Sequence, residues 1–149
     1  MQACGIIGGG AAIPFKSMFI QVNISFHYGI TDLSANNIVA NNRNSGIGAY
    51  NGVTLIADYN DVIGNSPNYY GSAARKGPHD ISADPQFVNP TAGDYHLRFG
   101  SPAMNAGTGV DAPAYDKDGV ARPQGRGVDM GAYEVVVYDV YLPLTVRNY

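Results

Sequence analysis

The sequence predicts an all-β protein, a short right-handed parallel β-helix with about 23 residues per coil and irregular ends. Three observations predict it: an internal repeat, short segments rich in β-branched residues, and an unusual composition. Only 14% of the residues are charged, and the chain contains 19 glycines and 11 tyrosines. Because glycine favours turns and tyrosine favours strands, this composition indicates sheets joined by tight corners.

The repeat appears when the chain is shifted by 23 positions, so that residues 24–42 fall on residues 47–65. Glycines, asparagines and apolar positions then stay in phase. The aligned pairs are Ile24/Ile47, Gly29/Gly52, Ile30/Val53, Thr31/Thr54, Leu33/Ile56, Asn37/Asn60, Val39/Val62 and Asn42/Asn65. This period suits a leucine-rich repeat or one coil of a β-helix. Because Leu33 and Leu55 are the only leucines of the stretch, the β-helix is favoured.

The strands are expected in short segments that glycine and asparagine separate. Within the repeat these segments are residues 24–26, 29–33, 37–40 and 53–56. Residues 66–71 are predicted to form a loop and residues 72–80 an insertion. Strand-like apolar residues return at Ile81, at residues 87–88 and at residues 95–97. The glycine-rich start predicts an irregular first turn.

Stacked coils would place equivalent residues directly above one another, at a spacing of about 4.8 Å. The pair Val39 and Val62 would then form part of an apolar ladder inside the solenoid. Two asparagine pairs, Asn37 with Asn60 and Asn42 with Asn65, would stack their side-chain amides and accept the left-handed corner conformation. A structural role for these asparagines is favoured over the alternative, a role in glycan binding.

From Tyr59 onward the sequence resembles the C-terminal end of bacterial proteins with parallel β-helix repeats, many of them exported and pectate-lyase-like. The motifs that carry this resemblance are Tyr59-Asn60-Asp61-Val62, Gly64-Asn65, residues 83–88, Asp94-Tyr95-His96-Leu97, residues 100–107, Asp116-Lys117-Asp118-Gly119, Arg122-Pro123 and residues 128–134. The resemblance implies secretion or surface exposure. It also implies that the Gly-Ala-Tyr-Glu motif at residues 131–134 closes the solenoid. We therefore expect one domain over residues 1–134 and a β-prone tail over residues 135–149.

Composition also excludes several classes of function. A net charge of −3 without a cluster of lysine or arginine disfavours nucleic-acid binding. No apolar run is long enough to span a bilayer. Cys4 is the only cysteine, so the chain can form neither an internal disulfide nor a thiolate metal site.

Catalytic and metal-binding candidates are few. A lyase needs a Lys or Arg base and usually calcium, and the nearest match to such a set is Arg75, Lys76 and His79 in the predicted insertion. A solvated loop is the favoured interpretation of these three residues. Asp116 and Asp118 resemble part of a calcium loop, which makes Ca²⁺ the one cofactor considered. Because Ala114 occupies the position of the first ligand, an Asx turn is favoured there.

Four tyrosines are candidates for stacking on sugar rings: Tyr28, Tyr50, Tyr69 and Tyr70. They could equally cover the flank of the solenoid. The expected function is a non-catalytic structural or adhesive module of an exported or cell-surface protein, which presents a face to glycans or self-associates. The alternative is the C-terminal piece of a lyase or hydrolase that acts on acidic polysaccharide, with its active site upstream.

Overall fold

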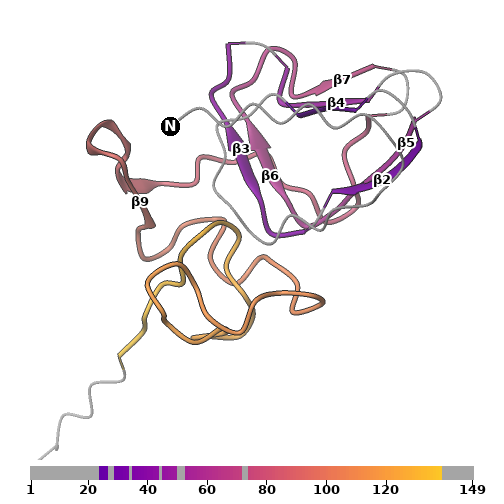
Figure 1. Cartoon of the computed structure of the whole chain (residues 1–149). Helices are drawn as coiled ribbons and strands as arrows, with labels where there is room; N and C mark the ends of the chain where they lie inside the picture. Colours follow the sequence, from indigo (N-terminus) through magenta and orange to yellow (C-terminus); the bar gives the residue numbers. More distant parts are fainter. Residues whose placement is uncertain are drawn as a thin grey trace, which may run out of the picture.

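The computed structural model describes residues 24–26, 29–33, 35–43, 45–49, 53–71 and 74–138, and these residues form an all-β protein (Figure 1). Apart from one 3-10 turn, η1, all of their regular structure is β-strand. The elements in chain order are β1 (Ile24–Phe26), β2 (Gly29–Leu33), β3 (Ile38–Ala40), β4 (Ile47–Ala49), β5 (Val53–Ala57), β6 (Asp61–Ile63), β7 (Tyr69–Tyr70), β8 (Phe87–Asn89), η1 (Pro90–Ala92) and β9 (Asp94–Leu97). Within the described part of the chain, no helix is long and apolar enough to cross a bilayer.

The first seven strands form three small parallel sheets, with the orders β1-β4-β7, β2-β5 and β3-β6. In Figure 1 the members of each sheet lie side by side. Two of these pairings keep the spacing of the sequence repeat. Ile24 pairs with Ile47 and Val39 pairs with Val62, in each case 23 positions apart. The repeat therefore corresponds to strands that stack in parallel.

The pairing of β2 with β5 differs from the prediction by one residue. Ile30 pairs with Thr54 and Leu33 with Ala57, whereas the repeat predicted Val53 and Ile56 as the partners. The cause is the length of the corners. Two residues separate β1 from β2, but three separate β4 from β5, and the following corner is shorter by one. Because the extra residue is compensated at that next corner, β3 and β6 return to the predicted register.

The region after Asn65 also departs from the expected pattern. Residues 66–71 were predicted as a loop, but Tyr69 and Tyr70 form strand β7, which extends the β1-β4 sheet. Ile81 forms an isolated parallel bridge with Asp61. The next two strands, β8 and β9, lie where the sequence predicted strands, yet they pair antiparallel as a hairpin around η1. Gly93 closes that turn in the left-handed conformation, with φ of 79°.

Strand β3 is buried on both faces. Val39 points into a cluster with Ile47 and Val62, to which Ala57 also belongs. The neighbouring side chains, Ile38 and Ala40, point the other way, into a cluster formed with Leu97, Ala103 and Met130. Successive side chains of a strand face opposite sides. Strands β3 and β6 therefore lie between two apolar clusters, the one that contains Val39 and Val62 and the one shared with the C-terminal region.

The C-terminal region, residues 98–138, is mostly turns held together by buried polar groups (Figure 1, orange and yellow). Arg122 Nη1 lies 3.1 Å from Glu134 Oε1, and both side chains are almost completely buried. Arg122 also donates to the carbonyl oxygens of Asp129 and Gly131. The Arg-Pro and Gly-Ala-Tyr-Glu motifs thus meet in one buried ion pair. The contacts continue one residue beyond the expected domain end at 134, since Val135 donates to Asp129 and packs on the core.

Candidate functional site

The structure brings together both predicted asparagine pairs. The backbone N–H and side-chain amide of Asn37 donate to Asn60 Oδ1 at 3.0 and 2.9 Å. The same groups of Asn42 donate to Asn65 Oδ1 at 2.9 and 2.8 Å. Asn60 is fully buried. Hydrogen bonds within the protein engage these side chains, an arrangement that suits a structural ladder.

The left-handed corners lie one residue before each ladder asparagine. Positive φ values occur at Asn36 and Asn41, and 23 positions later at Tyr59 and Gly64. The expectation that the ladder asparagines themselves occupy this conformation is therefore wrong. Asn and Gly suit positive φ, whereas Tyr59, with φ of 57°, is an aromatic residue held there by its surroundings.

His79, a weak catalytic candidate, is oriented by Asp58. Its Nδ1 lies 2.8 Å from Asp58 Oδ2, and its backbone N–H donates to Asp58 Oδ1 at 2.7 Å. The ring stacks on Tyr59 with the centroids 4.3 Å apart. Burial raises the pKa of Asp58, but the hydrogen bonds from His79 outweigh it, so this pKa is lowered. The other two candidates, Arg75 and Lys76, are exposed on the adjoining loop.

The predicted sugar-stacking tyrosines have different environments. Tyr28 and Tyr50 lie outside the described residues. Tyr69 is half-buried and donates its hydroxyl to Asp80 Oδ2 at 2.8 Å. Its burial, together with that hydrogen bond and the charge of Asp80, raises its pKa far above the usual value. Tyr70 is 45% exposed, so of the described pair it is the more accessible to a ligand.

Asp116 and Asp118, the candidate calcium ligands, make contacts within the protein. Asp116 Oδ1 accepts the backbone N–H groups of Asp118 and Val120, and its Oδ2 accepts the N–H of Glu134. With Gly119 in the left-handed conformation, these bonds define an Asx turn. Among the residues that the structure describes, no group of three or more His, Cys, Asp or Glu side chains is arranged to hold a metal ion.

Asp118 instead contacts His96 of the β8–β9 hairpin. His96 Nε2 lies 3.0 Å from Asp118 Oδ2, and its Nδ1 lies 2.6 Å from Asp94 Oδ1. The imidazole also stacks on Tyr133, with 3.9 Å between the centroids. The hydrogen bond that His96 donates to Asp94 is the main cause of its raised pKa, and the bond with Asp118 adds to it. These contacts join the hairpin to the C-terminal turns.

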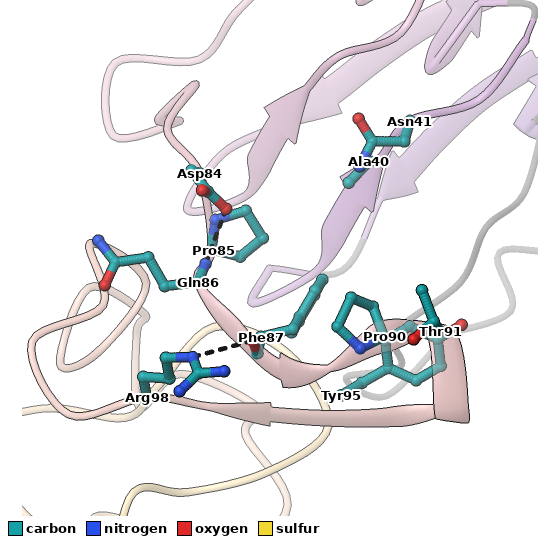
Figure 2. Close-up of a pocket in the computed structure, with 10 residues that line it drawn as sticks. All are labelled: Ala40, Asn41, Asp84, Pro85, Gln86, Phe87, Pro90, Thr91, Tyr95 and Arg98. Carbon is teal, nitrogen blue, oxygen red and sulfur yellow. Dashed lines mark hydrogen bonds between the residues drawn. The ribbon is translucent and has the colours of Figure 1, made fainter.

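A cleft of about 540 Å³ lies between the end of β3 and the hairpin (Figure 2). Figure 2 shows Ala40 and Asn41 across the cleft from Phe87, Pro90 and Tyr95. The residues that line it are Ala40, Asn41, Asp84, Pro85, Gln86, Phe87, Pro90, Thr91, Tyr95 and Arg98. It combines ring faces with amide, hydroxyl, carboxylate and guanidinium groups, the combination found in small-molecule sites.

None of these lining residues was a candidate in the sequence analysis. Phe87 and Tyr95 appeared there only as strand residues, and the sequence gives no sign that they meet. Antiparallel pairing of β8 and β9 places their rings edge to face, 5.4 Å apart. The combination of aromatic residues with Asp84, Gln86 and Arg98 within fifteen positions is the one local signal that could have indicated a site.

Comparison of the chain with protein-family models, curated proteins and solved structures gave no match.

Proposed function

We propose that the chain is a short right-handed parallel β-helix that serves as a non-catalytic structural or adhesive module of an exported or cell-surface protein. The observation that carries this proposal is the pair of asparagine ladders, Asn37 with Asn60 and Asn42 with Asn65. They join strands that pair in parallel about one repeat apart. The resemblance of residues 59–134 to C-terminal β-helix regions supports the same fold and the exported location.

The physical link from this fold to its role is rigidity. Ladders of hydrogen-bonded amides fix the corners, while Val39 and Val62 fill the space between the sheets. A rigid stack of this kind offers flat faces on which exposed side chains keep fixed spacings. Tyr70 is one such exposed side chain and can stack on a sugar ring. Presentation of a face to glycans is therefore the favoured function.

A second candidate is a piece of a lyase or hydrolase that acts on acidic polysaccharide. The observation in its favour is the hydrogen-bonded Asp58–His79 pair beside Arg75 and Lys76, because a carboxylate that fixes an imidazole is a common device of acid–base catalysis. Against it, the described cleft is lined by other residues, and none of the three predicted catalytic residues borders it.

Two assays on the full chain test the proposal. The first measures retention on immobilised plant and bacterial polysaccharides, with Tyr70→Ala as the variant. The second follows the ultraviolet absorbance of unsaturated uronates formed from polygalacturonate or alginate, with and without calcium. We expect retention that Tyr70→Ala weakens, and no turnover. Turnover that His79→Ala abolishes would instead favour the enzyme, and the absence of both signals would contradict the adhesive function.

A further inference from the structure

The cleft beside the β8–β9 hairpin is built from segments that are distant in the sequence. Ala40 and Asn41 form one wall, and residues 84–98 supply the opposite wall and one end. Ala40 is buried in the same core cluster as Leu97, so the hairpin is anchored to β3 by packing. The walls are therefore held by core contacts, which gives the cleft a defined shape before any ligand binds.

Hydrogen bonds also fix the polar groups of the cleft. Arg98 donates from Nε to the carbonyl oxygen of Phe87 and from Nη2 to that of Val88, at 3.3 and 2.6 Å. The first of these bonds is drawn in Figure 2. Asp84 Oδ1 accepts the backbone N–H of Gln86 at 2.9 Å, and the Asp84 residue is exposed. Preorganised donors and acceptors of this kind lose little entropy when they bind.

The lining selects the chemical class of the ligand. Phe87, Tyr95 and Pro90 offer apolar ring faces that suit the C–H face of a pyranose. Asn41, Gln86 and Thr91 supply amide and hydroxyl groups that can form hydrogen bonds with sugar hydroxyls. The charged groups of Asp84 and Arg98 can do the same. The two ionised side chains, Asp84 and Arg98, carry opposite charges, so the lining has no net charge. Arg98 Nε and Nη2 already donate to backbone carbonyl oxygens. A uronic acid polymer would therefore bring a carboxylate toward Asp84 with little compensation from Arg98, a cost that a neutral sugar avoids.

We propose that this cleft, formed by the end of β3 and the β8–β9 hairpin, binds a short segment of a neutral oligosaccharide. The inference rests on the proposed glycan-presenting function and deepens it by naming the site and the class of sugar. The cavity volume of about 540 Å³ falls within the range of about 300–1,000 Å³ found for small-molecule sites. Tyr95 stacks on a ring, and Asp84 accepts hydroxyl donors.

Isothermal titration of the full chain with defined hexasaccharides tests the site. The probes are cellohexaose, mannohexaose, xylohexaose and, as the acidic counterpart, hexagalacturonate. We expect at least one neutral probe to bind and hexagalacturonate to bind at least about tenfold more weakly. Tyr95→Leu and Asp84→Asn should each weaken the neutral complex by about tenfold. The matched control Tyr115→Leu, a tyrosine exposed outside the cleft, should leave it unchanged.

Several outcomes overturn the inference and separate it from the proposed function. If Tyr70→Ala abolishes binding while Tyr95→Leu and Asp84→Asn do not, glycans are presented elsewhere, and the proposed function stands without this site. Equal or tighter binding of hexagalacturonate contradicts the neutral class, and no binding of any neutral probe contradicts the site. If Tyr95→Leu lowers the melting temperature strongly, Asp84→Asn decides the test, because Asp84 is exposed and its substitution keeps an acceptor for Gln86.

Discussion

Asn60 is the most heavily engaged residue of the ladder. Its Oδ1 accepts two hydrogen bonds from Asn37, and its Nδ2 donates to Asp80 Oδ1 and to the carbonyl oxygen of Asp58. We expect Asn60→Ala to lower the free energy of unfolding by about 2–4 kcal/mol, because it leaves buried donors and acceptors without partners. Urea denaturation measures the change.

Asn42→Ala is the matched control for that substitution. The side chain of Asn42 is only partly buried and donates one hydrogen bond, to Asn65. Loss of this hydrogen bond should lower the free energy of unfolding by about 1 kcal/mol. Equal effects of the two substitutions would contradict a special role for Asn60 in the ladder.

A second prediction concerns Asp61 and the dependence of the free energy of unfolding on pH. Its side chain is fully buried, Oδ1 accepts the N–H of Ala83, and Oδ2 has no hydrogen-bond partner. Burial is the main cause that raises its pKa from 3.8 to about 6. The folded state therefore keeps this proton to a higher pH than the unfolded state does. Its stabilising contribution is fully present below pH 3.8 and is lost as the pH rises through about 6.

The variant Asp61→Asn should remove this pH dependence. Relative to the parent chain, its free energy of unfolding should rise by about 2–3 kcal/mol between pH 4 and pH 7, since each pKa unit corresponds to about 1.4 kcal/mol. Urea denaturation at four pH values between 4 and 7 provides the measurement. Phe99→Leu, at an exposed residue without an ionisable group, should keep the slope of the parent. An unchanged slope in Asp61→Asn would refute the assignment.

The sequence could indicate one of these residues and not the other. Asn60 was predictable because its repeat partner is another asparagine, and amides stack well. Asp61 has Ile38 as its repeat partner, so the repeat gives no reason for a buried carboxylate there. Its burial and its bond from Ala83 depend on the chain returning past β6 after residue 80, which the periodicity does not reach.

At the scale of elements, His96 links the hairpin to the turn that contains Asp118. Its pKa is raised above 6.5, chiefly by the hydrogen bond with Asp94. Folding therefore favours the protonated, charged form of His96. The stability that it adds is present below pH 6.5 and falls as the pH rises through the folded pKa.

We expect His96→Gln to remove this decline. The free energy of unfolding of the parent, measured in urea between pH 6 and pH 9, should fall more steeply than that of the variant. Val110→Ala, at an exposed residue without an ionisable group, serves as the control and should preserve the parent's profile. Parallel profiles for the parent and His96→Gln would show that the link does not stabilise the fold.

The positions of the strands along the chain were easier to predict than the way in which the strands pair. Short β-branched segments identified most strands, but the corner between β4 and β5 has one more residue than its counterpart, which shifts the β2–β5 register. Tyr69 and Tyr70 follow Ser66 and Pro67, so turn chemistry concealed strand β7. The antiparallel direction of the hairpin arises from the turn at η1 and Gly93, and strand composition alone does not specify it.

At the scale of the whole molecule, the cleft and the C-terminal core join segments far apart in the chain. Asn36 shows the distance involved, since it exchanges hydrogen bonds with Thr108, 72 positions away. Such contacts leave no periodic signal. Arg122 and Glu134 belong to two separate motifs of the C-terminal region, and their buried ion pair joins these motifs.

Self-association is the prediction for the whole chain. Val136, Val137 and Tyr138 are exposed β-prone side chains that follow Val135, which packs on the core. Exposed strand-forming segments can pair with a second molecule. Light scattering should give a mass above the 15.8 kDa of one chain. Deletion of residues 136–149 should reduce association, because it removes the exposed segment and keeps the core contacts of Val135. A monomer at high concentration, unchanged by the deletion, would contradict this expectation.

Scalar couplings measured through hydrogen bonds in solution report directly whether parallel strands stack one repeat apart. The structure has the N–H of Asp61 donating to the carbonyl oxygen of Asn37 and the N–H of Asn41 donating to that of Ile63. We expect a coupling between the nitrogen and the carbonyl carbon of each of these pairs. Couplings that instead connect Asp61 to another residue of the first repeat, or that indicate antiparallel pairing of β3 with β6, would contradict it.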